Sequence, residues 1–175
     1  VIVMHPSDVV STKLLTMQLA ESGSPSYTRT ARNKTPVLYE GREDEIKIGK
    51  GVVLREGKDV AIIACGVMVS QSLEAADALA AEGISAAVVD MHTLKPLDGE
   101  LIDRLVATCG ALVTAEDHSV IGGLGGAVAE PLTSNAYAPL ERVGVQDRFG
   151  ESGEADEMLE VMEISSPFIA EAAKR

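Results

Sequence analysis

The feature that most constrains the fold is a regular alternation of short apolar runs with helix-like segments between residues 59 and 145. Each apolar run is bounded by polar residues or glycine, which is typical of buried strands. Asp98 and Ser70 are suited to begin helices, and Gly83 and Gly110 are suited to end them. The predicted strands are residues 59–64, 84–89, 111–115 and 140–145, and the predicted helices cover residues 70–82, 98–109, 124–134, 155–161 and 167–174. Strands that alternate with helices in this way form a mostly parallel sheet that is covered on both faces.

Residues 1–29 repeat the pattern once. A short strand over residues 1–4 leads to a helix capped by Ser7 or Asp8 and ended by Gly23, and a second strand follows over residues 25–29. The two strands of such a β-α-β unit run parallel. One unit cannot cover both faces of a parallel sheet, so we expect it to pack on the rest of the chain or to belong with missing neighbours. The first residue is not methionine, which suggests a fragment or a processed chain.

A polar stretch over residues 33–45 with Pro36 and Gly41 indicates a linker. It predicts two domains, residues 1–40 and residues 46–175, with the boundary near residues 39–45. Residues 1–40 are then a β-α-β remnant of a larger domain.

Apolar and polar residues alternate in part over residues 46–54, which also contain Gly49 and Gly51. This pattern predicts an edge strand with a bulge. Glu56-Gly57-Lys58 fits a tight hairpin turn, so this strand is expected to run antiparallel to the next one. The predicted fold is therefore a three-layer α/β/α domain with a five-stranded, mostly parallel sheet and one antiparallel edge strand.

The charge of the chain limits the partners it can have. It contains 27 acidic and 15 basic residues, a net charge of −12, which disfavours nucleic acid and anionic membranes as partners. The sequence contains no apolar run long enough to span a bilayer and shows no secretory signal. Cys65 and Cys109 lie far apart, so we expect two buried, reduced thiols in a cytoplasmic protein.

A glycine-dense turn, Gly122-Gly123-Leu124-Gly125-Gly126, opens one predicted helix. Amide groups at a helix start can bind an anion, and close packing of helix on sheet is the alternative role for the glycines. The dinucleotide-binding pattern is broken because Val128 occupies its third glycine position. We favour the packing role.

Two pairs of acidic and histidine side chains follow predicted strands. Asp90 and His92 follow one strand, and Glu116 and His118 follow another, so the four could in principle hold a metal ion. Neither pair has a recognised metal-ligand spacing. We favour a local hydrogen-bond network and predict no metal ligands and no catalytic residues in this chain.

Tyr27, Arg29 and Arg32 end the first β-α-β unit. An arginine at the carboxyl end of a parallel strand is well placed to bind a phosphate or carboxylate with two hydrogen bonds. Pairing with acidic surface residues is the alternative, and the sequence leaves both open.

The segment with Asp147 and Arg148 has two possible roles. It predicts either a local salt bridge with Phe149 packed beneath the loop or a loop that contacts a partner.

Several motifs together resemble the transketolase family of thiamine-diphosphate-dependent enzymes. The first two resemble the last third of its pyrimidine-binding domain, and the others resemble its C-terminal domain: Pro6-Ser7-Asp8, Tyr27-x-Arg29-x-x-Arg32, Ile48-Gly49-Lys50, Gly57-Lys58-Asp59-Val60, Thr93-Leu94-Lys95-Pro96-Leu97-Asp98, Glu116 through Gly126 and Asp147 through Gly153. Deoxyxylulose-phosphate synthase and the β subunits of 2-oxo acid dehydrogenases share some of them. The Arg-Phe-Gly-Glu-Ser-Gly segment favours transketolase. Pro131 departs from the family, which usually continues a helix there with an apolar residue.

The resemblance implies a transferase of carbohydrate and pentose phosphate metabolism that moves two-carbon ketol units between sugar phosphates. It implies thiamine diphosphate and Mg²⁺ as cofactors of the complete enzyme. The Gly-Asp-Gly segment that holds them in the family is absent here, so we expect no bound cofactor and no activity for this chain alone. Arg32 aligns with the family arginine that binds the substrate phosphate, and Arg29 is a second candidate.

The implied partners are an N-terminal transketolase section or subunit, a second copy in a homodimer, and sugar-phosphate substrates. Two other functions stay open at this point. One is a fragment of deoxyxylulose-phosphate synthase, and the other is a non-catalytic assembly or anion-binding module that uses the glycine turn and the Asp147 loop.

Overall fold

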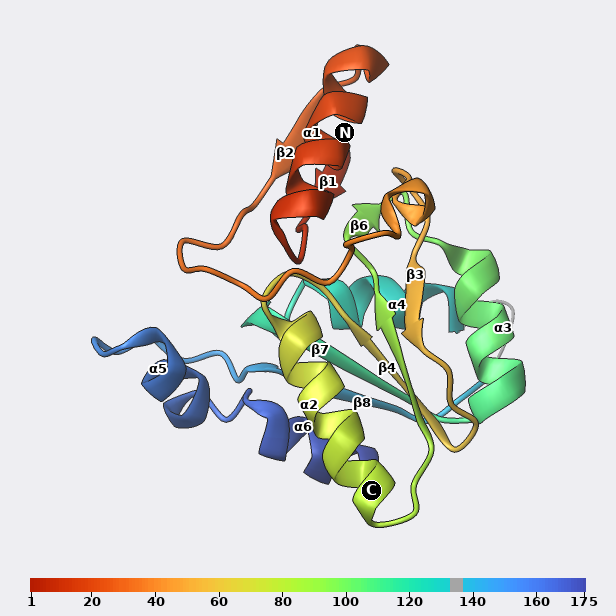
Figure 1. Ribbon diagram of the computed structural model, residues 1–175. Coiled ribbons are helices and arrows are strands. Elements are labelled where there is room, and N and C mark those ends of the chain that lie inside the picture. Colours follow the sequence, from red (N-terminus) through yellow and green to blue (C-terminus); the bar gives the residue numbers. More distant parts are fainter. Residues whose placement is uncertain (133–136) are drawn as a thin grey trace.

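The larger of two β-sheets is the framework on which the helices pack, and it sets the positions of the carboxyl ends of its strands. The computed structural model describes residues 1–132 and 137–175 (Figure 1). This sheet has the order β3-β5-β4-β7-β8, in which β3 is antiparallel to β5 and the other neighbours are parallel. Its strands are β3 (Val52–Arg55), β4 (Val60–Ala64), β5 (Ala86–Asp90), β7 (Leu112–Ser119) and β8 (Leu140–Val145). The predicted fold class is confirmed.

Helices cover both faces of this sheet. Alternate residues of β4 point to opposite sides, so that Ile62 lies in the core beneath α2 and α6 while Ile63 lies in the core beneath α3 and α4. The helices are α2 (Met68–Ala81), α3 (Gly99–Cys109), α4 (Leu124–Leu132), α5 (Ala155–Val161) and α6 (Ser166–Ala173). Asp98 caps α3 as expected, through a bond from the amide of Leu101. In contrast, α2 begins before Ser70, whose hydroxyl donates to the Val67 carbonyl at 3.0 Å.

The predicted hairpin after β3 is wrong. Strand β3 is antiparallel but pairs with β5, with a register shift between Val53 and Arg55, and β4 lies on the other side of β5. The connection therefore passes the end of β5. A Cβ on Gly57 would lie 2.1 Å from the Ala87 nitrogen, so glycine permits this close crossing.

The N-terminal segment forms the second sheet together with a strand from later in the chain. Strands β1 (Ile2–Met4) and β2 (Ser26–Thr28) are parallel, and α1 (Val9–Ser22) connects them, capped by Asp8 and ended by Gly23 as predicted. The sequence analysis missed β6 (Thr93–Lys95), which pairs antiparallel with β1. Figure 1 shows this unit at the end of the larger sheet. The division into residues 1–40 and 46–175 stays a prediction.

Two buried carboxyl groups hold the linker at Leu38 and Tyr39, and one of them belongs to the larger sheet. Asp8 accepts hydrogen bonds from the Leu38 and Tyr39 amides at 2.8 and 3.2 Å. Asp90, at the end of β5, accepts from the Ser7 hydroxyl at 2.5 Å and the Tyr39 hydroxyl at 2.8 Å. Burial raises the pKa of Asp90 to about 7, and both hydroxyl hydrogen bonds oppose the increase. The linker after β2 therefore ends at a fixed position, before the short turn η1 (Glu43–Glu45).

Helix α4 contains Pro131 at its next-to-last position. Proline is poorly tolerated in a helix interior, and its place near the end limits the disruption to the last turn. The predicted extension of this helix over residues 133–134 lies outside the described residues. Among the described residues, no helix is both long enough and apolar enough to cross a membrane.

Candidate functional site

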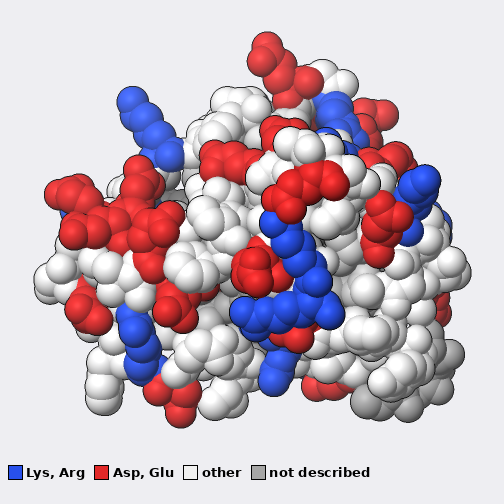
Figure 2. Space-filling view, turned by 90° about the horizontal axis from the view of Figure 1, so that it is seen from below, with Lys and Arg blue, Asp and Glu red and all other residues white. Residues whose placement is uncertain are grey.

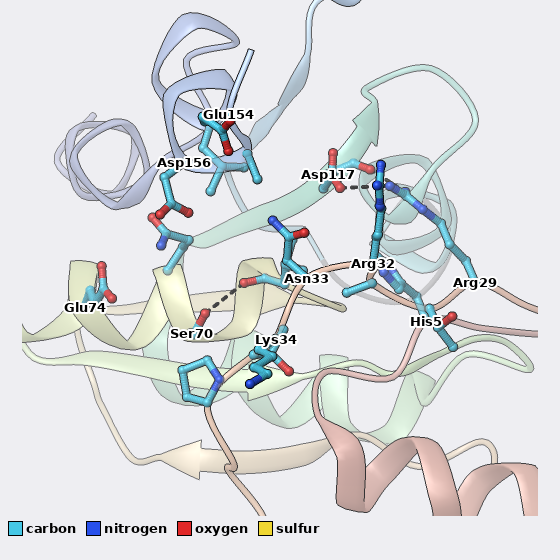
Figure 3. A pocket seen from close by; sticks show the side chains of 18 of the residues that line it. His5, Arg29, Arg32, Asn33, Lys34, Ser70, Glu74, Asp117, Glu154 and Asp156 are labelled. Carbon is cyan, nitrogen blue, oxygen red and sulfur yellow. Dashed lines mark hydrogen bonds and ion pairs between the residues drawn. The ribbon is translucent and has the colours of Figure 1, made fainter. Parts of the chain in front are cut away.

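A cavity of about 1000 Å³ lies where three parts of the fold meet. Its walls come from the segment after β2, the first turns of α2 and the start of α5, and the end of β7 closes it (Figure 3). The carboxyl ends of β1, β2 and β7 all lie beside it, which is the usual location of a ligand site in an open α/β sheet.

Arg29 and Arg32, the two predicted site residues, line this same cavity. Arg29 uses one terminal nitrogen to donate to the Asp117 carbonyl and the other to donate to the Asp117 carboxylate at 2.8 Å. Arg32 is exposed at the cavity edge, and so is Lys34. Arg29 is therefore paired with an acidic residue of the cavity wall, while the binding of a phosphate by Arg32 or Arg29 stays a prediction.

The cavity has a basic side and an acidic side. Figure 3 shows Arg29 and Arg32 together with His5 and Asp117, while Glu74, Glu154 and Asp156 lie across the cavity from them. An anionic ligand is therefore expected to bind at the arginine side.

His5 lies beneath the arginine side as a neutral group. Burial lowers the pKa of His5 to about 4, and the positive charge of Arg29 adds to the effect. Its ring packs on Gly66, where a Cβ would lie 2.1 Å from the ring, and Nδ1 is 3.7 Å from Cys65 Sγ. Both predicted buried thiols are observed, and burial raises the pKa of Cys65 above its usual range. Neither His5, which directly follows β1, nor Gly66, which lies two residues after the end of β4, was identified as a site residue from the sequence.

The glycine-dense turn already holds an anion from this chain. The buried carboxylate of Glu116 accepts from the Leu124 amide at 2.7 Å and from the Gly125 amide at 2.9 Å, at the start of α4. A Cβ on Gly123 would lie 1.9 Å from that carboxylate, and one on Gly125 would contact Thr114 and Arg142. Gly123 and Gly125 therefore permit close contact with side chains of β7 and β8, while the amides at the helix start bind a carboxylate of the same chain. The sequence analysis did not identify Glu116 as the group that occupies this helix start.

The two acidic–histidine pairs have separate local partners. Burial lowers the pKa of His92 to about 4, and its Nδ1 lies 2.9 Å from the Thr93 hydroxyl. His118 is half exposed, with Nδ1 2.9 Å from the Ser119 carbonyl and 3.9 Å from Glu116. Across residues 1–132 and 137–175, no three His, Cys, Asp or Glu side chains form a group suited to a metal ion.

The loop after β8 does not show the salt bridge predicted for Asp147 and Arg148 or the packing predicted for Phe149. Arg148 donates to the Val161 carbonyl and to the Met162 sulfur, and it lies 3.7 Å from Glu151 instead of pairing with Asp147. The Phe149 side chain is 97 % exposed, so the ring is not packed beneath the loop.

The surface charges agree with the acidic composition. Figure 2 shows acidic side chains in several groups on one face, with basic side chains between them. The exclusion of nucleic acid as a partner stays a prediction from net charge.

Comparison with known proteins gives consistent matches. The family model of the transketolase C-terminal domain matches residues 49–169. The chain is 43% identical over 171 residues to the putative transketolase C-terminal section of Methanocaldococcus jannaschii, covering 97% of this chain and 53% of that protein. It is also 43% identical over 171 residues to a 6-deoxy-6-sulfo-D-fructose transketolase subunit of Clostridium sp. strain MSTE9, covering 98% and 53%. The chain thus spans about half the length of the curated relatives it matches.

A solved structure described as a split-gene transketolase, inactive β4 tetramer, has the same fold. It superposes with a TM-score of 0.95 at 43% sequence identity, covering 99% of this chain and 56% of that one.

Proposed function

This chain belongs to the family of transketolase C-terminal domains, and on that premise we propose that it is a C-terminal part of an enzyme that moves two-carbon ketol units between sugar phosphates. The observation that supports the proposal is the convergence of Arg29 and Arg32 on one cavity beside the strand ends. A guanidinium group matches the geometry of a phosphate, and Arg32 is exposed at the cavity. The proposed role of Arg32 is to bind the terminal phosphate of the sugar.

The residues of this chain do not fit thiamine diphosphate and its metal. The described residues contain no cluster of ligands for Mg²⁺, and the amides at the start of α4 already bind Glu116. The sequence also has no Gly-Asp-Gly segment. We therefore assign the cofactor and the carbanion chemistry that it supplies to other, cofactor-binding domains of the complete enzyme, and this chain contributes substrate binding and assembly.

The proposed assembly contains this chain, a second copy of it and an N-terminal section. The solved relative is described as an inactive tetramer of one subunit type. By analogy, we expect self-association without activity until the N-terminal section joins. The proposed setting is the pentose phosphate metabolism of the cytoplasm.

Replacing Arg32 with alanine tests the phosphate-binding role. In the assembled enzyme, we expect Arg32→Ala to raise KM for a ketose phosphate about 10- to 100-fold, because a charged hydrogen-bonding partner of the phosphate is lost. KM for an unphosphorylated ketose is expected to stay unchanged. Steady-state kinetics with both donors makes the comparison, and Arg104→Ala, an exposed arginine on α3, is the matched control.

Equal effects of Arg32→Ala on both donors would count against a phosphate contact.

The same assay distinguishes a transketolase from a deoxyxylulose-phosphate synthase. If pyruvate replaces the ketose phosphate as the efficient donor, the enzyme is a deoxyxylulose-phosphate synthase and the transketolase proposal fails.

A further inference from the structure

The segment that carries Arg32 depends on contacts at its two ends. Strand β2 stops at Thr28, and residues 29–37 form neither helix nor strand. At the far end, the Leu38 and Tyr39 amides bind the buried carboxylate of Asp8. At the near end, the Arg29 amide binds the Met4 carbonyl at 3.0 Å. The position of Arg32 therefore depends in part on how Arg29 and Tyr39 are held.

The side chain of Arg29 adds a contact to the larger sheet. Arg29 and Asp117 lie 88 positions apart in the sequence, and both terminal nitrogens of Arg29 bind Asp117. The exposed fractions of the two side chains are 36% and 39%, so the pair lies at the cavity wall and is not buried in the core. Because one bond goes to a main-chain carbonyl and the other to the carboxylate, the plane of the guanidinium is fixed.

Asp117 lies in an irregular stretch of β7 that is paired with β8 on both sides. Ala115 pairs with Val143 and Ser119 pairs with Val145, and the register shifts between these two pairs. Its neighbour Glu116 is buried and binds the start of α4. Asp117 therefore presents its carbonyl and carboxylate from a stretch that is held by Glu116 and by the flanking strand pairs.

We propose that Asp117 is a positioning residue for the anion site, acting through Arg29 to hold the segment with Arg32 at the cavity. The inference rests on the proposed phosphate-binding role of that cavity. Asp117 does not contact the ligand.

The contacts leave part of Arg29 free for a ligand. A guanidinium has five N–H groups. Asp117 accepts two of them, which leaves the remaining donors of Arg29 for an anion. If Asp117 instead competed with the anion for Arg29, Asp117→Asn would lower the Kd for phosphate.

The test measures binding of inorganic phosphate to the assembled enzyme by calorimetric titration. Asp117→Asn retains the carbonyl contact and removes the charge, and we expect it to raise the Kd for phosphate about tenfold. Asp117→Glu is expected to restore part of the affinity. In a double-mutant cycle, Arg29→Gln and Asp117→Asn together are expected to weaken binding no more than Arg29→Gln alone, because Asp117 acts only through Arg29.

Kinetics and a matched control separate positioning from a loss of folding. We expect Asp117→Asn to raise KM for the ketose phosphate while kcat is retained. Glu82→Gln removes another exposed ion pair, with Lys174 directly after α6, and is expected to leave the phosphate Kd unchanged. Additive losses in the cycle, or a Kd that is unchanged or lower in Asp117→Asn, would overturn the inference.

Phosphate binding by Arg32→Ala distinguishes failure of the positioning role of Asp117 from failure of the proposed function. If the wild type binds phosphate and Arg32→Ala loses it while Asp117→Asn binds normally, only the positioning role is wrong. If the wild type itself binds no phosphate, the cavity is not an anion site and the positioning inference fails with it.

Discussion

Glu116→Gln is expected to lower the free energy of unfolding by about 3 kcal/mol, since a buried amide is left without an acceptor. The two oxygens of Glu116 each accept one amide hydrogen bond, at 2.7 and 2.9 Å, and its side chain is only 2 % exposed. Glutamine offers one oxygen and places its NH₂ group against the second amide donor. The start of α4 would also lose a negative charge that favours a helix N-terminus.

Urea denaturation of the two proteins measures this difference. Glu141→Gln changes an exposed glutamate on β8 and is expected to stay within about 0.5 kcal/mol of the wild type. A loss of similar size in both variants would mean that Glu116 does not hold the glycine turn.

Asp90→Asn is expected to change the pH dependence of stability. Burial raises the pKa of Asp90 from 3.8 to about 7 in the folded chain. Between these two values the folded chain keeps a proton that the unfolded chain has released, so the stability of the wild type falls as pH rises. Asparagine does not titrate. Relative to Asp90→Asn, the wild type is therefore expected to lose up to about 4 kcal/mol between pH 4 and pH 8 and little above that.

Denaturant titrations of both proteins across this pH range test the effect. The pKa values of His5 and His92 are lowered to about 4, and both histidines are present in each protein, so to first order their contributions cancel in the difference. Tyr39→Phe serves as a second variant. It removes a hydrogen bond that lowers the pKa of Asp90, so the loss of stability is expected to continue to a higher pH than in the wild type. A stability difference that is constant from pH 4 to pH 8 would contradict a titrating buried Asp90.

Local signals were enough to predict most elements of the fold. Asp8 with Gly23 and Asp98 with Gly110 bound their helices in the structure as predicted, because caps act within one turn. The apolar run over residues 140–145 is the observed strand β8. Alternation of strands and helices then indicated a parallel sheet.

The errors come from contacts between distant residues. Strand β3 skips β4 to pair with β5, and β6 leaves the larger domain to pair with β1. A turn motif such as Glu56-Gly57-Lys58 gives no information on which strand lies alongside. The same reason explains why the tie between Arg29 and Asp117 and the role of Glu116 at α4 were missed, although Arg29 and Arg32 were identified as site residues.

Reconstitution of ketol transfer tests the proposed function most directly. The measurement is the rate of two-carbon transfer from a ketose phosphate to an aldose phosphate, with thiamine diphosphate and Mg²⁺ present. It compares the full-length C-terminal protein that contains this sequence, an N-terminal transketolase section from the same source, and their equimolar mixture. We expect transfer only in the mixture, since the cofactor site needs both sections. Transfer by the C-terminal protein alone, or a stable complex of the two that transfers nothing, would contradict the proposed division of the enzyme.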